Sequence, residues 1–341
     1  MESRKPASKE RPNDMVIDLS AVIVAVTEDR PLVLVRHGLA LDAAEARSIA
    51  RGFDVAGEAL PSGPFDAANH RTLDRGLRET VSESIGVTLG YVEQLYTFGD
   101  RGRHPREREG GPRVISVGYL ALTKEAQMAA TQNTAWRSWY DYFPWEDWRN
   151  SRPDFIDKVI APLLRQWVDK ATSRNEKRQR LDRARLCFAL DETVWDEEIV
   201  LERYELLYEA GLAAEAQREI TGRRQEQSML PSMGNPMMSD HRRILATAMG
   251  RLRAKLKYRP IVFDLMPETF SLFHLQRTIE AILGERLHKQ NFRRLVERSG
   301  VVESTGEIQI QPRGRPAALF RFRKEVLRER LAAGVRISTT R

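Results

Sequence analysis

Hydrophobic residues in the first 150 positions form strand-length runs around one helical stripe. Four apolar runs, rich in β-branched residues, lie at residues 15–27, 32–36, 92–98 and 114–123. Between the second and third runs, apolar residues recur every four positions at Leu73, Leu77, Val81 and Ile85. This is the spacing of one helix face, and Gly86 ends the expected helix. The order strand, strand, helix, strand, strand predicts a domain of the mixed α/β or α+β kind.

The pattern turns helical after an aromatic segment at residues 136–148. That segment is compatible with a stacking platform for a base, but Trp at this density more often packs helices against a sheet or forms a subunit contact, and we favour packing. Residues 153–227 are strongly charged and helical in pattern, with a solvated helix or linker at 174–185 and an amphipathic helix at 198–216. A stretch rich in Met, Pro and Gly at 228–238 is the clearest boundary.

The last hundred residues have the order of elements of a winged helix-turn-helix. Helical spacing covers residues 239–257, and a second helix is expected between an N-cap at Ser271 and an end at Gly284. A third helix at 289–299 is followed by a basic hairpin. Its strands and turn are expected at residues 308–310, 319–323 and 312–316.

Charge is divided unevenly along the chain. The net charge is +7, yet from His241 onward 22 Lys and Arg face 9 Asp and Glu, so the preceding residues are acidic. In the helix at 239–257 the cations, among them Arg242, Arg243 and Arg253, are expected largely outside the apolar face. A basic end of this kind indicates a polyanion partner, and its order of elements indicates duplex DNA. The alternatives are a solvated basic surface on an ordinary helical domain, and an RNA-binding module, which would need sheet-borne aromatics or glycine loops.

The helix at 289–299 has the chemistry of a recognition helix. Its apolar residues Phe292, Leu295 and Val296 are expected to face inward. Asn and Gln can bond bidentately to adenine, and Arg and Lys to guanine. We therefore expect DNA contacts from the polar side of this helix and from the tip of the hairpin: Lys289, Gln290, Asn291, Arg293, Arg294, Arg298, Arg313 and Arg315.

Composition sets wide limits. With 341 residues, 41% of them hydrophobic and 30% charged, the chain can form two or three domains. The first 13 residues are expected to be a disordered tail, and they lack the apolar segment of a secretory signal. No apolar run reaches the length of a membrane span, so we expect a cytoplasmic protein. Cys187 is the only cysteine, which excludes an intrachain disulfide or a cysteine-built zinc site.

Two parts of the chain resemble a known family. The runs YVEQLYTFGDRGRHP and VISVGYLAL, together with residues 240–300, are similar to the Nudix-related transcriptional regulators of NAD metabolism, the NrtR group. A long helical insertion and the phrase LHKQNFRRLV make the NadQ-type branch the closest resemblance. The resemblance implies an α+β protein: a Nudix-like α/β/α sandwich at 14–150, a helical insertion at 151–235 and a winged helix-turn-helix at 236–341. It further implies a homodimeric repressor of NAD biosynthesis genes on a palindromic operator.

The Nudix box departs from the catalytic pattern. Aligned on Gly86, the box has Glu83 at the first of the paired glutamates, but Ser84 at the second and Thr80 at the earlier glutamate. If the alignment is shifted by one residue, Arg78 and Glu79 become the Arg-Glu pair of the box. Only one of the paired glutamates is then present. Because a hydroxyl cannot replace a carboxylate charge around Mg²⁺, we expect no catalytic or metal site. The rival reading is an ADP-ribose pyrophosphatase with an accessory nucleic-acid-binding domain.

The resemblance implies that the Nudix-like domain senses ADP-ribose, NAD or ATP and that the protein needs no cofactor. The residues expected to contact such an effector are Arg36, Tyr96, Arg101 and Arg103, with Phe98 as a further possibility. A structural role is at least as common for each of these residue types, and Tyr96 and Phe98 alternate as core residues on a strand do. His241, beside Asp240, is expected to cap or contact a helix because no nucleophile accompanies it.

Overall fold

The computed structural model describes residues 15–27, 29–37, 58–87, 89–101, 107, 111–124, 133–221, 231–310 and 316–326. The side chains of residues 84, 220 and 221 are outside this description. The predicted tail at 1–13 also lies outside the described residues. So do most of the predicted hairpin turn and three expected site residues: Arg103, Arg313 and Arg315.

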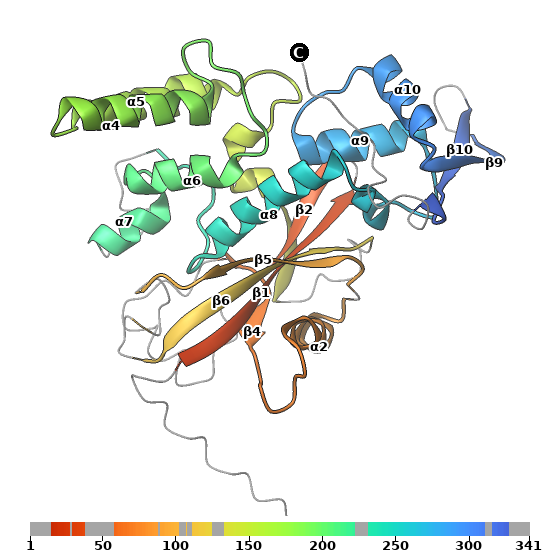
Figure 1. Cartoon of the computed structure of the whole chain (residues 1–341), viewed down its shortest axis with the longest axis horizontal. Coiled ribbons are helices and arrows are strands. Elements are labelled where there is room, and N and C mark those ends of the chain that lie inside the picture. The colour runs from red at the N-terminus through yellow and green to blue at the C-terminus, as the bar shows by residue number, and fades with distance from the viewer. Residues whose placement is uncertain are drawn as a thin grey trace, which may run out of the picture.

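Among the described residues, seven strands form one mixed sheet (Figure 1). The strand order is β3-β2-β1-β6-β5, with β4 added to β1 and β7 added to β2. The central pair, β1 and β6, is parallel from Met15↔Arg113 to Val24↔Leu122. The strand bounds are β1 Met15–Thr27, β2 Arg30–His37, β3 Glu58–Ala59, β4 Ser62–Pro64, β5 Val92–Phe98, β6 Arg113–Leu122 and β7 Thr134–Ser138. The four predicted runs are confirmed as β1, β2, β5 and β6.

Helices cover both faces of this sheet. The helix α2, Leu73–Ile85, lies on one face, where Leu77 and Val81 pack against β1 residues such as Ile23. Thr72 caps its first turn by accepting from the Arg75 amide at 3.2 Å, and Gly86 ends it at φ 74°, a conformation that favours glycine. The helix α8, His241–Leu256, lies on the opposite face (Figure 1). The result is the predicted α/β/α sandwich, built with a helix that comes late in the chain.

Helix α8 was expected to open the DNA-binding module, but it packs on the sheet. Ile244 shares a buried core with Val22 of β1 and Leu120 of β6. The Nδ1 atom of buried His241 accepts a hydrogen bond from the Leu60 amide at 2.9 Å, so its contact is structural but is made with the β3–β4 connection rather than with a helix. The division at residue 236 stays a prediction, while these contacts join α8 to the sandwich.

The helical insertion stacks on α8 and on the aromatic segment. Trp139, Tyr142, Phe143 and Trp145 are all fully buried, so the packing interpretation of this segment is confirmed. The single helix expected at 198–216 is wrong: it divides at Gly211, whose φ of 70° places it in the left-handed region. The bounds are η1 Trp139–Asp141, η2 Pro144–Glu146, η3 Ile156–Ile160, α4 Ala161–Asp169, α5 Arg174–Phe188, α6 Val200–Glu209 and α7 Ala214–Thr221.

The C-terminal part is a winged helix. Ser271 caps its first helix by accepting from the His274 amide at 3.1 Å, and Gly284 ends that helix at φ 78°, as predicted. A three-stranded sheet of order β8-β10-β9 forms the wing. The bounds are η5 Ile261–Leu265, β8 Thr269–Ser271, α9 Leu272–Leu283, α10 Lys289–Ser299, β9 Val302–Gln309 and β10 Ala317–Phe322.

Candidate DNA-binding and effector sites

The outer face of α10 carries cations that form no ion pair with the described carboxylates. Phe292 and Val296 are buried and anchor this helix to α9 and β9. The six predicted contact residues of the helix are all exposed: Lys289, Gln290, Asn291, Arg293, Arg294 and Arg298. Within the described residues none of its four cations forms an ion pair, and Arg294 only donates to the side-chain oxygen of Asn291 at 3.3 Å. This face can therefore accept an external polyanion without first losing an internal partner.

Helix α5 shows the contrast. It is also rich in arginine, but most of its cations are paired on the surface. Arg180 lies 2.6 Å from Glu176, and Arg183 lies 2.6 Å from Glu209 on α6. A surface cation that is already paired with a carboxylate offers little net attraction to a phosphate. The two helices are therefore distinguished by the pairing of their cations and not by the number of cations.

The arginines of α8 are a correction to the sequence analysis. Arg242, Arg243 and Arg253 are buried rather than solvent-facing. They pair with carboxylates that are distant in sequence: Arg242 with Glu215, Arg243 with Glu205 and Arg253 with Glu146. Because their charges are neutralised internally, the basic end presents less positive charge to a partner than its composition suggests.

A buried carboxylate fixes the turn between α9 and α10. Glu280 is almost fully buried, and its Oε1 accepts from Gln276 Nε2 at 2.8 Å and from the Leu287 amide at 3.0 Å. Its other oxygen lies 3.2 Å from Arg277 and 2.7 Å from Arg286. This network sets the path of the chain just before α10. The sequence analysis missed Glu280, although an acidic residue inside the apolar stripe of a helix was a usable signal.

The wing presents a mixed surface. Arg321 on β10 is paired with Glu303 on β9 at 2.6 Å. Ile308 and Ile310 are exposed near the end of β9. The expected contacts Arg313 and Arg315 fall outside the described residues and stay predictions.

The expected effector contacts do not form one cluster. Tyr96 is 66% exposed on β5 and packs edge-on against buried Phe98, with 5.4 Å between ring centroids. Arg101 follows the same strand and is exposed. Arg36 lies on β2, and β1 and β6 separate it from β5, which amounts to about 14 Å at roughly 4.8 Å per strand. A small effector would have to span this width to touch Arg36 and Tyr96 together.

The Nudix-like helix places its polar residues in structural contacts. A Cβ atom built on Gly63 would lie 2.8 Å from Cγ2 of Thr80, so Thr80 occupies the close approach between α2 and β4. Glu79 accepts from Nε of Arg75 at 2.5 Å, and this bond holds the pKa of the Glu79 carboxyl below its usual value. Arg78 pairs with Asp74 and donates to the Leu89 carbonyl at 2.9 Å. Glu83 is exposed on the solvent side of the helix.

The described residues hold no group of three or more His, Cys, Asp or Glu side chains placed to bind one metal ion. In the same part of the chain, no helix is both long and apolar enough to cross a membrane.

The chain thus combines a sandwich of the Nudix kind with a C-terminal winged helix. Residues 262–322 match the family model of the NrtR DNA-binding winged helix domain, and this part of the chain belongs to that domain family. The matched residues contain α9, α10 and both long strands of the wing.

Two relatives extend the comparison. The chain is 45% identical over 83 residues to the ADPR responsive transcriptional repressor NtrR of Acinetobacter baylyi, a match that covers 24% of this chain and 33% of the relative. The chain thus spans about a third of the length of this curated relative. The crystal structure of Shewanella oneidensis NrtR complexed with a 27mer DNA superimposes with a TM-score of 0.54 at 19% identity, over 91% of this chain and 94% of that one. The structure of the same NrtR without DNA gives 0.52 at 18% identity, over the same shares. These matches establish the fold over nearly the whole chain.

Proposed function

We propose that this chain is a cytoplasmic transcriptional repressor of NAD biosynthesis genes whose binding to its operator responds to ADP-ribose. The observation that carries the proposal is the exposed, unpaired cationic face of α10, which lies inside the segment matched by the NrtR DNA-binding domain. Recognition helices place such a face in the major groove, where Arg, Lys, Asn and Gln read base edges. The Acinetobacter relative, named as an ADPR responsive repressor, supports both the activity and the effector.

The repressor acts as a homodimer on a palindromic operator. A single recognition helix of 11 residues reads only one half-site, and two-fold symmetric dimers present two such helices about one helical turn of DNA apart. The wing, with Arg313 and Arg315 at its turn, adds contacts to the DNA backbone or minor groove.

The sandwich senses its effector without efficient hydrolysis. Catalytic Nudix boxes hold Mg²⁺ with several glutamates on the helix that corresponds to α2. Here Thr80 packs against Gly63, and Glu79 is engaged by Arg75. With Ser84 at a further glutamate position, the remaining box residue, Glu83, cannot assemble the cluster by itself. Arg36, Tyr96, Arg101 and Arg103 stay the proposed effector contacts, with NAD and ATP as the other ligands to compare.

The test is a binding titration of the full-length protein with labelled duplexes from the region upstream of NAD biosynthesis genes. We expect salt-sensitive binding to a palindromic site and weak binding to a scrambled duplex of equal length. Saturating ADP-ribose should shift the operator affinity, in a direction that the titration determines, and NAD and ATP serve as comparison ligands. Failure of all such duplexes to compete better than scrambled DNA overturns the repressor assignment. Rapid Mg²⁺-dependent turnover of ADP-ribose, abolished by Glu83→Gln, supports the hydrolase instead.

A further inference from the structure

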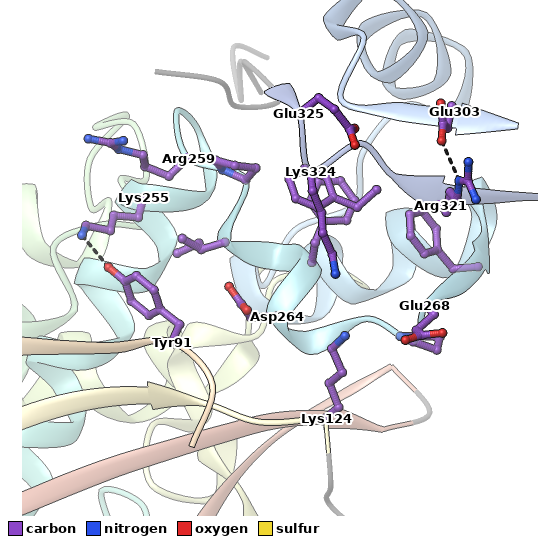
Figure 2. A pocket seen from close by; sticks show the side chains of 16 residues that line it. Tyr91, Lys124, Lys255, Arg259, Asp264, Glu268, Glu303, Arg321, Lys324 and Glu325 are labelled. Atoms are coloured by element: carbon purple, nitrogen blue, oxygen red, sulfur yellow. Dashed lines mark hydrogen bonds and ion pairs between the residues drawn. The ribbon is translucent and has the colours of Figure 1, made fainter. Parts of the chain in front are cut away.

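A deep cleft lies where the sandwich meets the winged helix (Figure 2). It has a volume of about 1010 Å³, large enough for a nucleotide. Its walls come from three places: the sheet at Tyr91 and Lys124, the end of α8 with η5, and the wing strands with the residues after β10.

Two lysines of the cleft form no ion pair within the described residues. Lys255 is held by Glu93 at 2.6 Å, and Arg321 by Glu303 at the same distance. Lys124 and Lys324 form no hydrogen bond or ion pair with any residue in the described part of the chain. Figure 2 shows their ammonium groups pointing toward one another from opposite walls, Lys124 from the sheet and Lys324 from the wing. Two like charges that face one another repel, and an anion held between them would be attracted by both.

A carboxylate beside these lysines also lacks a partner. Asp264 in η5 is half-buried, lines the cleft and accepts no hydrogen bond from the described residues. Burial raises the pKa of its carboxyl, an effect that Lys124 partly opposes. A half-buried acceptor without a donor is destabilising until a ligand or water supplies one. Hydroxyl groups of a ligand have the required chemistry.

The rest of the lining combines an aromatic and apolar patch with further charged residues of both signs: Lys255, Arg259, Glu268, Glu303, Arg321 and Glu325. Phe322 stacks on Phe263 with 4.3 Å between ring centroids, and Phe263 packs against Phe270 at 5.6 Å. All three residues line the cleft. The cleft therefore offers a planar ligand an aromatic surface for stacking, beside charged groups of both signs.

We propose that this cleft binds a nucleoside diphosphate, with the phosphates between Lys124 and Lys324, the ribose hydroxyls donating to Asp264 and the base against Phe322. This site goes beyond the proposed ADP-ribose sensor and does not share its expected contacts. Because Lys124 belongs to the sandwich and Lys324 to the winged helix, the ligand bridges the two and fixes the wing relative to the sheet. Operator affinity changes as a result only if the ligand binds the two wing orientations unequally.

Calorimetry on the full-length protein tests the site with two probes, ADP and inorganic pyrophosphate. We expect Lys124→Ala and Lys324→Ala each to weaken the binding of both probes at least tenfold. The matched control is Arg174→Ala, an exposed cation of α5 without an ion pair in the described residues, which should leave both affinities unchanged. Asp264→Asn should weaken ADP but not pyrophosphate, because pyrophosphate has no ribose hydroxyls.

Absence of ADP binding, or ADP binding that is insensitive to both lysines, overturns the proposal. Loss of ADP binding in Arg36→Ala with full binding in the lysine variants places ADP in the sensor and also overturns it. The ADP-ribose response of operator binding is measured on the same variants. A response that persists in the lysine variants keeps the proposed function intact whichever way the cleft experiment ends.

Discussion

The Asp29 carboxylate at the β1–β2 turn lies 3.0 Å from Nε of Arg277 on α9, and so joins the sandwich to the helix-turn-helix. The turn is itself held, since Arg149 donates to the Asp29 carbonyl at 2.5 Å. From Arg277 the contacts continue to Glu280, 3.2 Å away, and from Glu280 to the Leu287 amide just before α10. A path of three charged side chains and one backbone amide thus runs from a sheet hairpin to the turn just before α10.

We expect Asp29→Asn to reduce the effect of ADP-ribose on operator affinity while changing global stability little. The pair is partly exposed, at 39% for Asp29 and 28% for Arg277, and such ion pairs contribute about 0–1 kcal/mol to stability. Coupling between sites is typically about 1–3 kcal/mol, so losing one contact in the path is measurable. Operator titrations with and without ADP-ribose give the coupling, and Asp154→Asn, an exposed pair with Lys158, is the control. An undiminished ADP-ribose response in Asp29→Asn removes this contact from the coupling path.

Glu146 should be a strong determinant of stability. It is fully buried and pairs with two fully buried arginines, Arg203 from α6 at 2.6 Å and Arg253 from α8 at 2.5 Å. Removing the shared carboxylate leaves two uncompensated cations in the core, and breaking a buried pair costs about 3–5 kcal/mol. Urea unfolding of Glu146→Ala measures this loss. Glu209→Ala, which breaks an exposed pair with Arg183, should cost at most about 1 kcal/mol; equal losses in the two variants would contradict the prediction.

Glu280→Gln should weaken operator binding although Glu280 is buried and contacts no exposed face of α10. The substitution keeps the size of the side chain but removes the charge that Arg277 and Arg286 share. Leaving buried groups incompletely paired costs about 1–3 kcal/mol, and the loosened turn positions α10 less well. Operator affinity and thermal unfolding are measured together. Glu307→Gln, exposed on β9, is the control. A Glu280→Gln protein with unchanged operator affinity shows that the turn keeps its geometry without this charge.

The sequence predicts those parts of the fold whose determinants are local. Ser271 and Gly284 delimit α9 because a cap hydroxyl and a left-handed glycine act within one helical turn. Short strands such as β3 and β7 were missed, since two to five residues carry little periodicity and their pairing depends on β2. Ion pairs between residues far apart in the chain could not be predicted either. Arg253 was expected outside the apolar face, because its partner Glu146 lies 107 residues earlier.

The same division applies to the candidate sites. The exposed side of α10 followed from helical periodicity, because Phe292 and Val296 fix which side is buried. The junction cleft could not be predicted, since Tyr91, Asp264 and Lys324 are brought together only by the packing of the winged helix on the sandwich. The separation of the expected effector contacts could not be predicted either, because it depends on the order of strands in the sheet. Arg36 on β2 and Tyr96 on β5 are separated by two other strands.

The double substitution Arg293→Ala, Arg294→Ala should weaken operator binding and flatten its salt dependence. Each arginine that reads a base contributes about 1–3 kcal/mol, and each phosphate contact contributes roughly one unit to the log–log salt slope. Anisotropy titrations over a series of KCl concentrations measure both quantities. Arg183→Ala is a matched control, because it removes an arginine already paired with Glu209. Operator binding that survives intact in the folded double variant removes α10 from the recognition role.

The stability of the protein should depend on pH through the protonation of Asp264. Burial raises the pKa of its carboxyl above the ordinary value of 3.8, so the folded protein binds more protons than the unfolded chain between these two pKa values. Stability from this group is therefore highest below pH 3.8 and is lost as the pH rises through the folded pKa. Asp264→Asn is uncharged at every pH, so it should melt at a higher temperature than the parent at pH 7. That advantage should shrink as the pH is lowered toward 3.8, whereas Asp169→Asn, an exposed pair with Lys177, should show no gain at pH 7. Calorimetric melting of the three proteins from acidic to neutral pH checks this, and a gain for Asp264→Asn that stays constant across the range is incompatible with a raised carboxyl pKa.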